Sequence, residues 1–220
     1  KVVKKVSPDI LIIVDGVCSI AVEDLEFDKW GIDFALTASQ KAIGVPAGLS
    51  IFYASERALA KALNKEKEST FFASLKRWTP IMKAYESGNG AYFATPAVQT
   101  ITALKTSLDE ILSQPIDERF AKHAQVSDKF KSNVEKLGLK ILPVDHKVAA
   151  HGLTAVYFPD GINGPDLLKK LSEKGFVVAG GIHKKLVGKY FRVGHMGYSV
   201  YAGHVDKLTK ALEESLNELK

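Results

Sequence analysis

One lysine between two apolar runs is the feature that most constrains this chain. The run Ile32–Ala38 ends in small and polar residues, and Lys41 follows shortly after it. Two glycines and a proline then lead into a second apolar run, Leu49–Tyr53. This pattern predicts a strand, a tight turn that carries Lys41, and another strand. Burial in such a turn disfavours the ammonium ion, so the amine becomes a nucleophile suited to an aldehyde cofactor. The alternative is a surface lysine at a strand end.

An aspartate upstream strengthens the case for a site. The continuous apolar run Ile10–Val14 predicts a buried strand of a parallel sheet, and Asp15 ends it. Ligands bind outside the carboxyl ends of such strands, so we expect Asp15 and Lys41 at one sheet edge. A pyridoxal phosphate site needs this pair, a lysine for the Schiff base and a carboxylate that keeps the pyridine nitrogen protonated. Alternatively, Asp15 serves as a turn or cap residue.

Six short motifs lie along almost the whole chain: Val14–Ser19, Gly31–Phe34, Ser39–Ala42, Pro46–Gly48, Ala91–Pro96 and Tyr190–Gly197. Together they resemble the class V aminotransferases, in particular the alanine–glyoxylate (serine–pyruvate) aminotransferase family. The resemblance implies an α/β protein of the PLP-dependent transferase fold type I. Residues 1–114 would form the C-terminal part of the large, parallel or mixed-sheet PLP-binding domain, and residues 115–220 a small C-terminal α+β domain.

The resemblance also implies pyridoxal 5′-phosphate (PLP) as the cofactor. Lys41 would be the catalytic residue and would hold PLP as a Schiff base. Asp15 would hold the ring nitrogen, and Val17 would pack against a ring face, although Val17 is also explained as a core valine. Gln40 would help to anchor the phosphate or a ring oxygen.

Tyr92 and Thr95 stand just before a helix opened by Pro96. Hydroxyl groups beside the free N–H groups of a helix N-terminus suit phosphate oxygens. In the resembled family this tyrosine and threonine reach the phosphate of the neighbouring subunit's cofactor, which implies a homodimer. A simple helix cap is the alternative for Thr95.

Arg192 lies in a predicted strand between Phe191 and Val193. A guanidinium group binds a carboxylate with two parallel hydrogen bonds, and the resemblance implies that Arg192 binds the substrate carboxylate. An edge-strand arginine in water is the alternative. His183 and His195 have no metal-ligand spacing, so we interpret both as structural and expect no metal.

The activity implied by the resemblance moves the amino group of alanine or serine to glyoxylate. The products are glycine and either pyruvate or hydroxypyruvate, and the reaction follows ping-pong kinetics. A cysteine desulfurase-like enzyme is an alternative, but such enzymes place a histidine where this chain has Gln40, and Cys18 lies beside a core strand. A non-catalytic dimerisation fragment is the other alternative.

Composition bounds the remaining classes. The 220 residues are 46% hydrophobic, which suffices for a core, and the net charge of +5 is spread rather than clustered, so no nucleic-acid surface is expected. One cysteine fits a reducing compartment, and no run has transmembrane length. We expect an intracellular protein, cytoplasmic or peroxisomal with a mitochondrial location open, although Glu218–Lys220 is not the peroxisomal ending. A core strand so near residue 1 predicts the C-terminal portion of a longer protein.

Periodicity and turn residues predict the other elements. Helices are expected at 55–63, 74–85, 97–112, 116–137 and from 163 until Gly175, with a terminal helix from 201 to 219. Strands are expected at 34–39, 48–53, 139–144, 153–158, 176–179 and 189–193.

Overall fold

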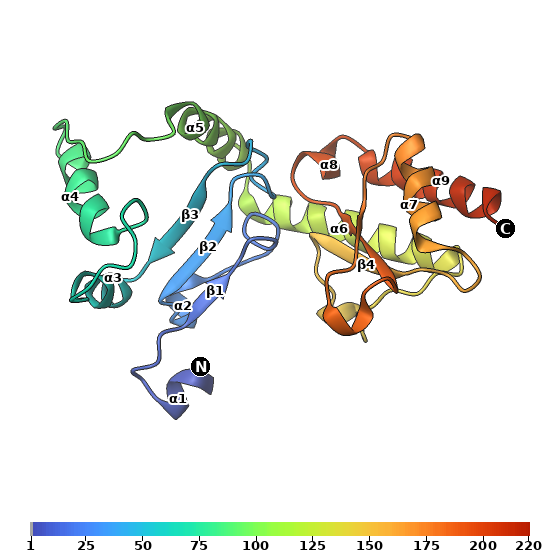
Figure 1. Cartoon of the computed structure of the whole chain (residues 1–220), viewed down its shortest axis with the longest axis horizontal. Coiled ribbons are helices and arrows are strands. Elements are labelled where there is room, and N and C mark those ends of the chain that lie inside the picture. The colour runs from blue at the N-terminus through green and yellow to red at the C-terminus, as the bar shows by residue number, and fades with distance from the viewer. Residues whose placement is uncertain (1) are drawn as a thin grey trace. The chain divides into compact units, whose positions relative to one another are not determined.

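The computed structural model describes residues 2–220, which fall into two compact units (Figure 1). The first unit runs up to Val17, from Leu25 to Ser39 and from Val45 to Lys105. The second contains Cys18–Asp24, Gln40–Gly44 and Thr106–Lys220. The short segment around Lys41 therefore makes most of its contacts with the second unit. The predicted domain boundary between residues 114 and 115 remains a prediction.

A mixed three-stranded sheet forms the first unit. Its strands are β1 (Ile13–Asp15), β2 (Phe34–Ala38) and β3 (Ser50–Ala54), in the order β1-β2-β3. β1 and β2 are parallel, with Asp15 opposite Leu36, whereas β2 and β3 are antiparallel. The α/β class and the parallel pairing of the first two strands are thus confirmed.

The first strand is shorter and more exposed than the sequence predicts. Only Ile13–Asp15 pairs as a strand, and the side chain of Ile13 is 64% exposed, so the prediction of a buried strand at Ile10–Val14 is wrong. The strand is short because side chains bind two of the backbone groups before Ile13. The Ile12 N–H donates to Asp33 at 2.8 Å, and the Ile10 carbonyl accepts from Lys4 at 2.6 Å.

Serine caps begin two of the helices that follow the sheet. Ser55 Oγ accepts from the Ala58 N–H and Ser74 Oγ from the Arg77 N–H, as expected for residues that satisfy free helix donors. The helices in the first half of the chain are α1 (Val2–Val6), α2 (Phe27–Trp30), α3 (Glu56–Leu63), α4 (Leu75–Glu86) and α5 (Val98–Leu112). The last three match the predicted helices.

The second unit packs three long helices against an antiparallel sheet with the order β4-β6-β5. The core contains Phe130, Leu167 and Leu212 from the helices, and Val156 and Phe191 from the strands. Its strands are β4 (Leu153–Tyr157), β5 (Ala179–Gly180) and β6 (Tyr190–Gly194); its helices are α6 (Ile116–Lys136), α7 (Gly164–Glu173), α8 (Tyr198–Tyr201) and α9 (His204–Glu218), with 3₁₀ turns at His146–Val148 and Lys184–Leu186. This agrees with the predicted small α+β arrangement.

Three predicted elements of this unit differ from the structure. The strand expected at 139–144 is a single bridge between Ile141 and Val156, because Pro143 has no N–H to extend the pairing. The strand expected at 176–179 is reduced to Ala179–Gly180, since the Phe176 N–H closes the end of α7 by bonding to Leu171. The terminal helix expected from 201 begins only at His204, as α9, because Gly203 before it has a φ of 67°, outside the helical region.

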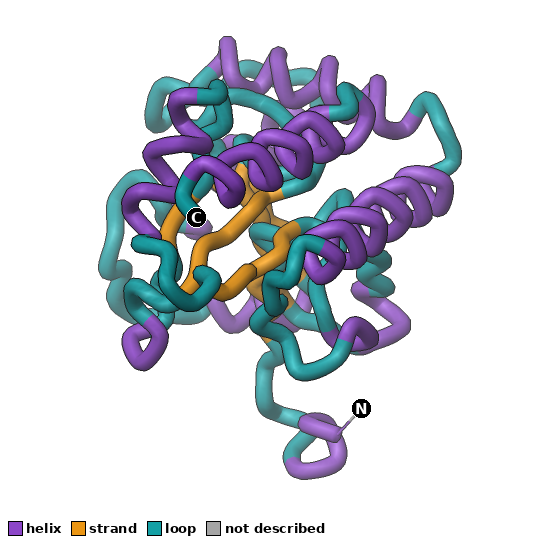
Figure 2. Tube along the Cα trace, turned by 90° about the vertical axis from the view of Figure 1, so that its right-hand side faces the viewer, coloured by secondary structure: helices purple, strands orange, loops and turns teal. Residues whose placement is uncertain are grey.

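A buried carboxylate ties α1 and α3 to the strands of the first unit. Figures 1 and 2 both show α1 standing apart from the β1–β2–β3 sheet, and none of its described residues is buried. Lys4 of α1 donates to Asp33 Oδ2 at 3.0 Å, and Arg57 of α3 donates to both Asp33 oxygens at 2.7 Å. Arg57 also reaches the carbonyl of Pro8 at 2.5 Å. Asp33 thus joins three separate pieces of chain.

The charge of Asp33 is stabilised by these donors. Burial alone would raise the pKa of this carboxyl, but hydrogen bonds from Arg57, the Ile12 N–H and Lys4 outweigh burial and hold the pKa well below its ordinary value of 3.8. A carboxyl whose pKa is lower in the folded state stabilises the fold above the unfolded pKa. That contribution is lost as the pH falls below 3.8.

Asp33→Asn should therefore lower the free energy of unfolding at pH 7 by about 3 kcal/mol, the lower end for a broken buried pair because Arg57 is partly in water. The difference from the wild type should shrink on acidification from pH 7 to pH 2, measured by urea unfolding. Asp28→Asn, an exposed position of α2, serves as the matched control and should change little. A difference that stays constant down to pH 2 would contradict this role of the Asp33 charge.

A neutral histidine is buried in the core of the second unit. His195 Nδ1 lies 3.0 Å from the His151 carbonyl, and Nε2 lies 2.7 Å from Thr154 Oγ1. A carbonyl only accepts, so Nδ1 carries the hydrogen and the Thr154 hydroxyl donates to Nε2. Burial lowers the pKa of His195 from 6.5 to about 4, so the unfolded chain takes up a proton first. The stabilising effect is present above pH 6.5 and disappears as the pH falls through about 4.

Thr154→Val should lower the free energy of unfolding by about 1–3 kcal/mol, because it leaves the buried Nε2 acceptor without a donor. Denaturant unfolding at pH 7 measures the loss. Thr209→Val is the control, since that hydroxyl bonds only to a helix carbonyl, of Val205, and its removal should cost less than about 0.5 kcal/mol. Equal losses in the two variants would show that the bond to His195 adds no stability.

Candidate active site

Asp15 stands at the carboxyl end of β1, where the sequence places it. Its side chain is exposed, and Oδ1 accepts from the Val17 N–H at 3.0 Å. The turn role proposed as an alternative is therefore present. No described residue bonds to Oδ2, so this oxygen is open to an external donor. Val17 is half-buried, and Cys18 is exposed.

A compact turn follows β2 and leads toward β3. Ser39 closes its base, since Ser39 Oγ donates to the Pro46 carbonyl at 2.8 Å and accepts from the Leu49 N–H at 3.2 Å. The Val45 N–H donates to the Ser39 carbonyl at 3.0 Å. The predicted strand, turn and strand are thus all present, with Lys41 inside the turn.

The three consecutive backbone carbonyls from Lys41 to Ile43 all accept hydrogen bonds. The Lys41 carbonyl accepts from Gly44, at 2.9 Å, the Ala42 carbonyl from Arg119 Nη2 at 2.6 Å, and the Ile43 carbonyl from the Ser107 hydroxyl. The Lys41 side chain is half-buried, and within the described part of the chain Nζ has no hydrogen bond or ion pair. The backbone at Lys41 is thus fixed by hydrogen bonds, whereas its amine has no partner among the described residues. Gln40 beside it is exposed.

Tyr92 and Thr95 form a hydroxyl pair before α5. Tyr92 Oη and Thr95 Oγ1 are 2.9 Å apart, and Tyr92 is 72% exposed. Phe93 between them packs edge to face on Trp78 of α4, with ring centroids 4.8 Å apart. Tyr85 of α4 donates to the Ala91 carbonyl at 2.7 Å. Aromatic contacts and one hydrogen bond therefore hold both hydroxyls at the surface of the first unit.

Arg192 lies on the face of β6 opposite the helical core. Its neighbours Phe191 and Val193 are buried, whereas Arg192 is half-buried and pairs with Ala155 and Ala179. Its Nε donates to the Gly180 carbonyl at 2.9 Å. No described residue bonds to the terminal nitrogens, so this end of the guanidinium is open to an anion.

The predicted residues divide between the two units. Asp15 and Val17 contact each other, and so do Tyr92 and Thr95, all in the first unit; Gln40, Lys41 and Arg192 belong to the second unit. Each side chain carries an unused polar or apolar group suited to the role expected of it. Those roles remain predictions.

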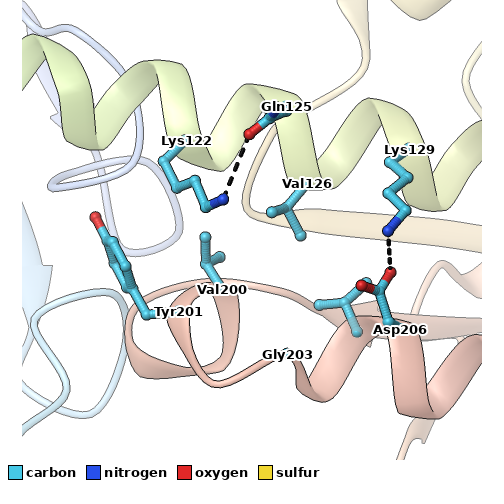
Figure 3. A pocket seen from close by; sticks show the side chains of 9 residues that line it. Lys122, Gln125, Val126, Lys129, Val200, Tyr201, Gly203 and Asp206 are labelled. Carbon is cyan, nitrogen blue, oxygen red and sulfur yellow. Dashed lines mark hydrogen bonds and ion pairs between the residues drawn. The ribbon is translucent and has the colours of Figure 1, made fainter.

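A separate cavity of about 270 Å³ lies in the second unit between α6 and the α8–α9 segment (Figure 3). Lys129 of α6 pairs across it with Asp206 of α9 at 2.7 Å, and Tyr201 lines one end. None of the predicted site residues lines this cavity. Within residues 2–220 no group of three or more metal-ligating side chains occurs.

Sequence reasoning missed several polar residues that hold the site segments. Arg119 and His123 are one helical turn apart on α6, and His123 is fully buried together with Ser127. The available signal was that these polar residues stand at core-facing positions of the helix, where they interrupt the apolar stripe and indicate a buried polar contact. Asp33 lies within a motif that carried the resemblance, but its partners are distant in sequence.

Sequence comparison shows that this chain is similar to known aminotransferases. Alanine–glyoxylate aminotransferase 1 of Saccharomyces cerevisiae is 51% identical over 201 residues, covering 89% of this chain and 51% of the yeast protein. Serine–glyoxylate aminotransferase of Arabidopsis thaliana is 34% identical over 187 residues, covering 85% of this chain and 45% of that protein. The chain thus spans about half the length of these relatives.

Solved structures give the same picture. The alanine–glyoxylate aminotransferase of a Nostoc species superposes with a TM-score of 0.85 at 29% identity, over 94% of this chain and 54% of that one. Pyridoxamine–pyruvate aminotransferase of Mesorhizobium loti gives 0.84 at 26% identity, over 95% and 53%. These neighbours are consistent with the predicted fold type I.

No helix among the described residues combines the length and apolar character needed to cross a membrane. The family model described as aminotransferase class-V matches residues 1–202, more than nine-tenths of the sequence. The resemblance inferred from short motifs is therefore confirmed: the chain belongs to the class V aminotransferase family.

Proposed function

We propose that this chain is part of a PLP-dependent aminotransferase that moves the amino group of alanine or serine to glyoxylate. The products are pyruvate or hydroxypyruvate and glycine, in a ping-pong sequence. The names of the yeast and plant relatives support the substrates. The observation that carries the proposal is the Lys41 turn, in which every carbonyl from Lys41 to Ile43 is bonded while the amine has no partner among described residues.

The side chains present fit PLP. A free amine at Lys41, an open carboxylate oxygen at Asp15 and the hydroxyl pair of Tyr92 and Thr95 match its aldehyde, its ring nitrogen and its phosphate. Val17 would pack on the ring, and Gln40 would assist the anchoring. In this proposal Tyr92 and Thr95 serve the cofactor of a second subunit, so the enzyme is a homodimer.

When bound, PLP withdraws electrons from the substrate Cα and so makes its proton removable. Lys41 Nζ would take that proton from Cα as a general base and would deliver it, as a general acid, to the aldehyde carbon of the cofactor. Asp15 would keep a positive charge on the ring nitrogen by ion pairing. Arg192 binds the α-carboxylate of the amino acid through its two free terminal nitrogens and thereby orients Cα.

The alternatives predict different behaviour. A cysteine desulfurase structure from Escherichia coli superposes with a TM-score of 0.71 at 18% identity, a likeness of fold alone. A desulfurase would release sulfur from cysteine and depend on a cysteine thiol. A non-catalytic dimerisation fragment would take up no cofactor at all.

Borohydride reduction of the full-length protein after incubation with PLP, followed by peptide mass mapping, should give a phosphopyridoxyl adduct on Lys41. The Lys41→Ala variant should lose the adduct, because no other amine then occupies this turn. Lys29→Ala, an exposed lysine of α2, is the control and should keep it. An adduct on a different lysine would overturn the assignment of Lys41, and no adduct on any lysine would overturn the enzyme proposal.

Arg192→Lys should raise the KM for alanine roughly tenfold to hundredfold, the equivalent of a charge-assisted hydrogen bond worth about 1.5–3 kcal/mol. Steady-state kinetics with alanine and glyoxylate measure the change. The exposed Lys189→Met, just before β6, is the control and should leave the KM unchanged. An amine substrate that lacks the α-carboxylate reacts slowly, and it should react at the same rate with the wild type and with Arg192→Lys. If Arg192→Lys impairs the reaction of this amine as much as that of alanine, Arg192 does not act on the carboxylate.

A further inference from the structure

We infer that Arg119 of α6 is a positioning residue for Lys41, and that His123 extends this restraint to the segment that follows Arg192. The catalytic part of the inference rests on the function proposed above for these two residues. Arg119 and His123 were given no role by the sequence, and neither provides the amine or the carboxylate-binding group. Their effect would pass through the backbone that carries those groups.

Arg119 binds two separate backbone segments with one guanidinium. Nη2 donates to the Ala42 carbonyl at 2.6 Å, and Nε donates to the Ala21 carbonyl at 2.8 Å. Ala42 directly follows Lys41 and is 1% exposed. The fork of a guanidinium is planar and rigid, so two carbonyls bound to it are held at a fixed separation. Lys41 is thereby attached to the segment that follows Val17.

The second of these segments is strained. Ala21 has a φ of 66°, the single left-handed residue other than glycine among the described residues. A Cβ in this region crowds the backbone, so the conformation persists only where contacts enforce it. The bond from Arg119 Nε to the Ala21 carbonyl is such a contact. Glu23 on the same segment accepts from the His151 N–H at 2.7 Å.

His123 closes a ring of contacts around the Lys41 segment. Its Nδ1–H donates to the Arg119 carbonyl at 2.8 Å, and its Nε2 accepts from the Gly197 N–H at 3.0 Å. Burial lowers the pKa of His123, which keeps Nε2 free to accept. Gly197 in turn touches Ala42: a Cβ there would lie 2.9 Å from the Ala42 carbonyl oxygen. Gly197 has a φ of 61° and follows β6, the strand of Arg192.

The catalytic value of this ring follows from the flexibility of lysine. A long side chain places its amine reproducibly only when the backbone beneath it is fixed. Proton transfer requires the amine within hydrogen-bond reach of the substrate Cα proton, and an error of about 1 Å costs roughly a hundredfold in rate. Arg119 restrains the Ala42 carbonyl by its hydrogen bond, and the close approach of Gly197 to the same carbonyl leaves it less room to move.

The first test needs no cofactor. Hydrogen–deuterium exchange of the full-length protein, read on the peptide that contains Gly44 and Val45, should be at least tenfold faster in Arg119→Met. Lys122→Met, an exposed cation on the same helix, is the matched control and should exchange like the wild type. Arg119→Lys, which keeps one donor for one carbonyl, should lie between them and serves if Arg119→Met does not fold. Wild-type exchange in both Arg119 variants would overturn the inference, whether or not the protein binds PLP.

The second test uses the holoenzyme. Arg119→Met should lower kcat for alanine roughly tenfold to hundredfold while the KM changes less than about threefold, because the carboxylate contact is untouched. Arg119→Lys should recover part of kcat. Faster exchange with an unchanged kcat would overturn the catalytic role of Arg119. Failure of the wild type to form the borohydride adduct on Lys41 would instead overturn the proposed function. The exchange result would still show whether Arg119 restrains the backbone of the Lys41 segment.

Discussion

The buried charge of Asp33 determines where the first strand begins. Its carboxylate takes the Ile12 N–H, so regular pairing starts one residue later and ends at Asp15. The same charge draws in Arg57 and Lys4, which bind the carbonyls of the chain leading into the strand. A carboxylate in an apolar setting is stable only with such donors around it. The location of Asp15 at the sheet edge is therefore a consequence of electrostatics as much as of apolar packing.

Both units use cations to bind backbone carbonyls that no strand or helix satisfies. In the first unit Arg57 reaches the Pro8 and Ile10 carbonyls, and in the second Arg119 reaches those of Ala21 and Ala42. A buried carbonyl without a donor is costly, so a loop that leaves the sheet needs a partner of this kind. Irregular segments can then be as well fixed as regular ones. This is the condition that a reactive lysine on a turn requires.

Local sequence patterns predicted most helices and strands, whereas contacts between residues far apart in the sequence were not predicted. The strands around Lys41 and the helices that begin after Ser55 and Ser74 depend on residues within a few positions of each other, so local patterns predicted them. The prediction of a strand at 139–144 was wrong because it followed the apolar pattern and neglected Pro143, which has no N–H for strand pairing. Arg119 binds a carbonyl 77 residues away, and no period or motif encodes such a pair. The candidate residues were found through family motifs, whereas the network that supports them required coordinates.

The antiparallel pairing of β2 with β3 has a consequence for the order of events during synthesis. The two strands are neighbours in sequence, so their hairpin closes a short loop and can form soon after both leave the ribosome. Lys41 is thus displayed on a nearly complete turn before α6 has been translated. The Ala42 carbonyl gains its hydrogen bond only with Arg119, 77 residues later, and the approach of Gly197 comes later still. In a nascent chain the Lys41 turn therefore forms before the residues that restrain it, and α6 and the segment after β6 complete those restraints.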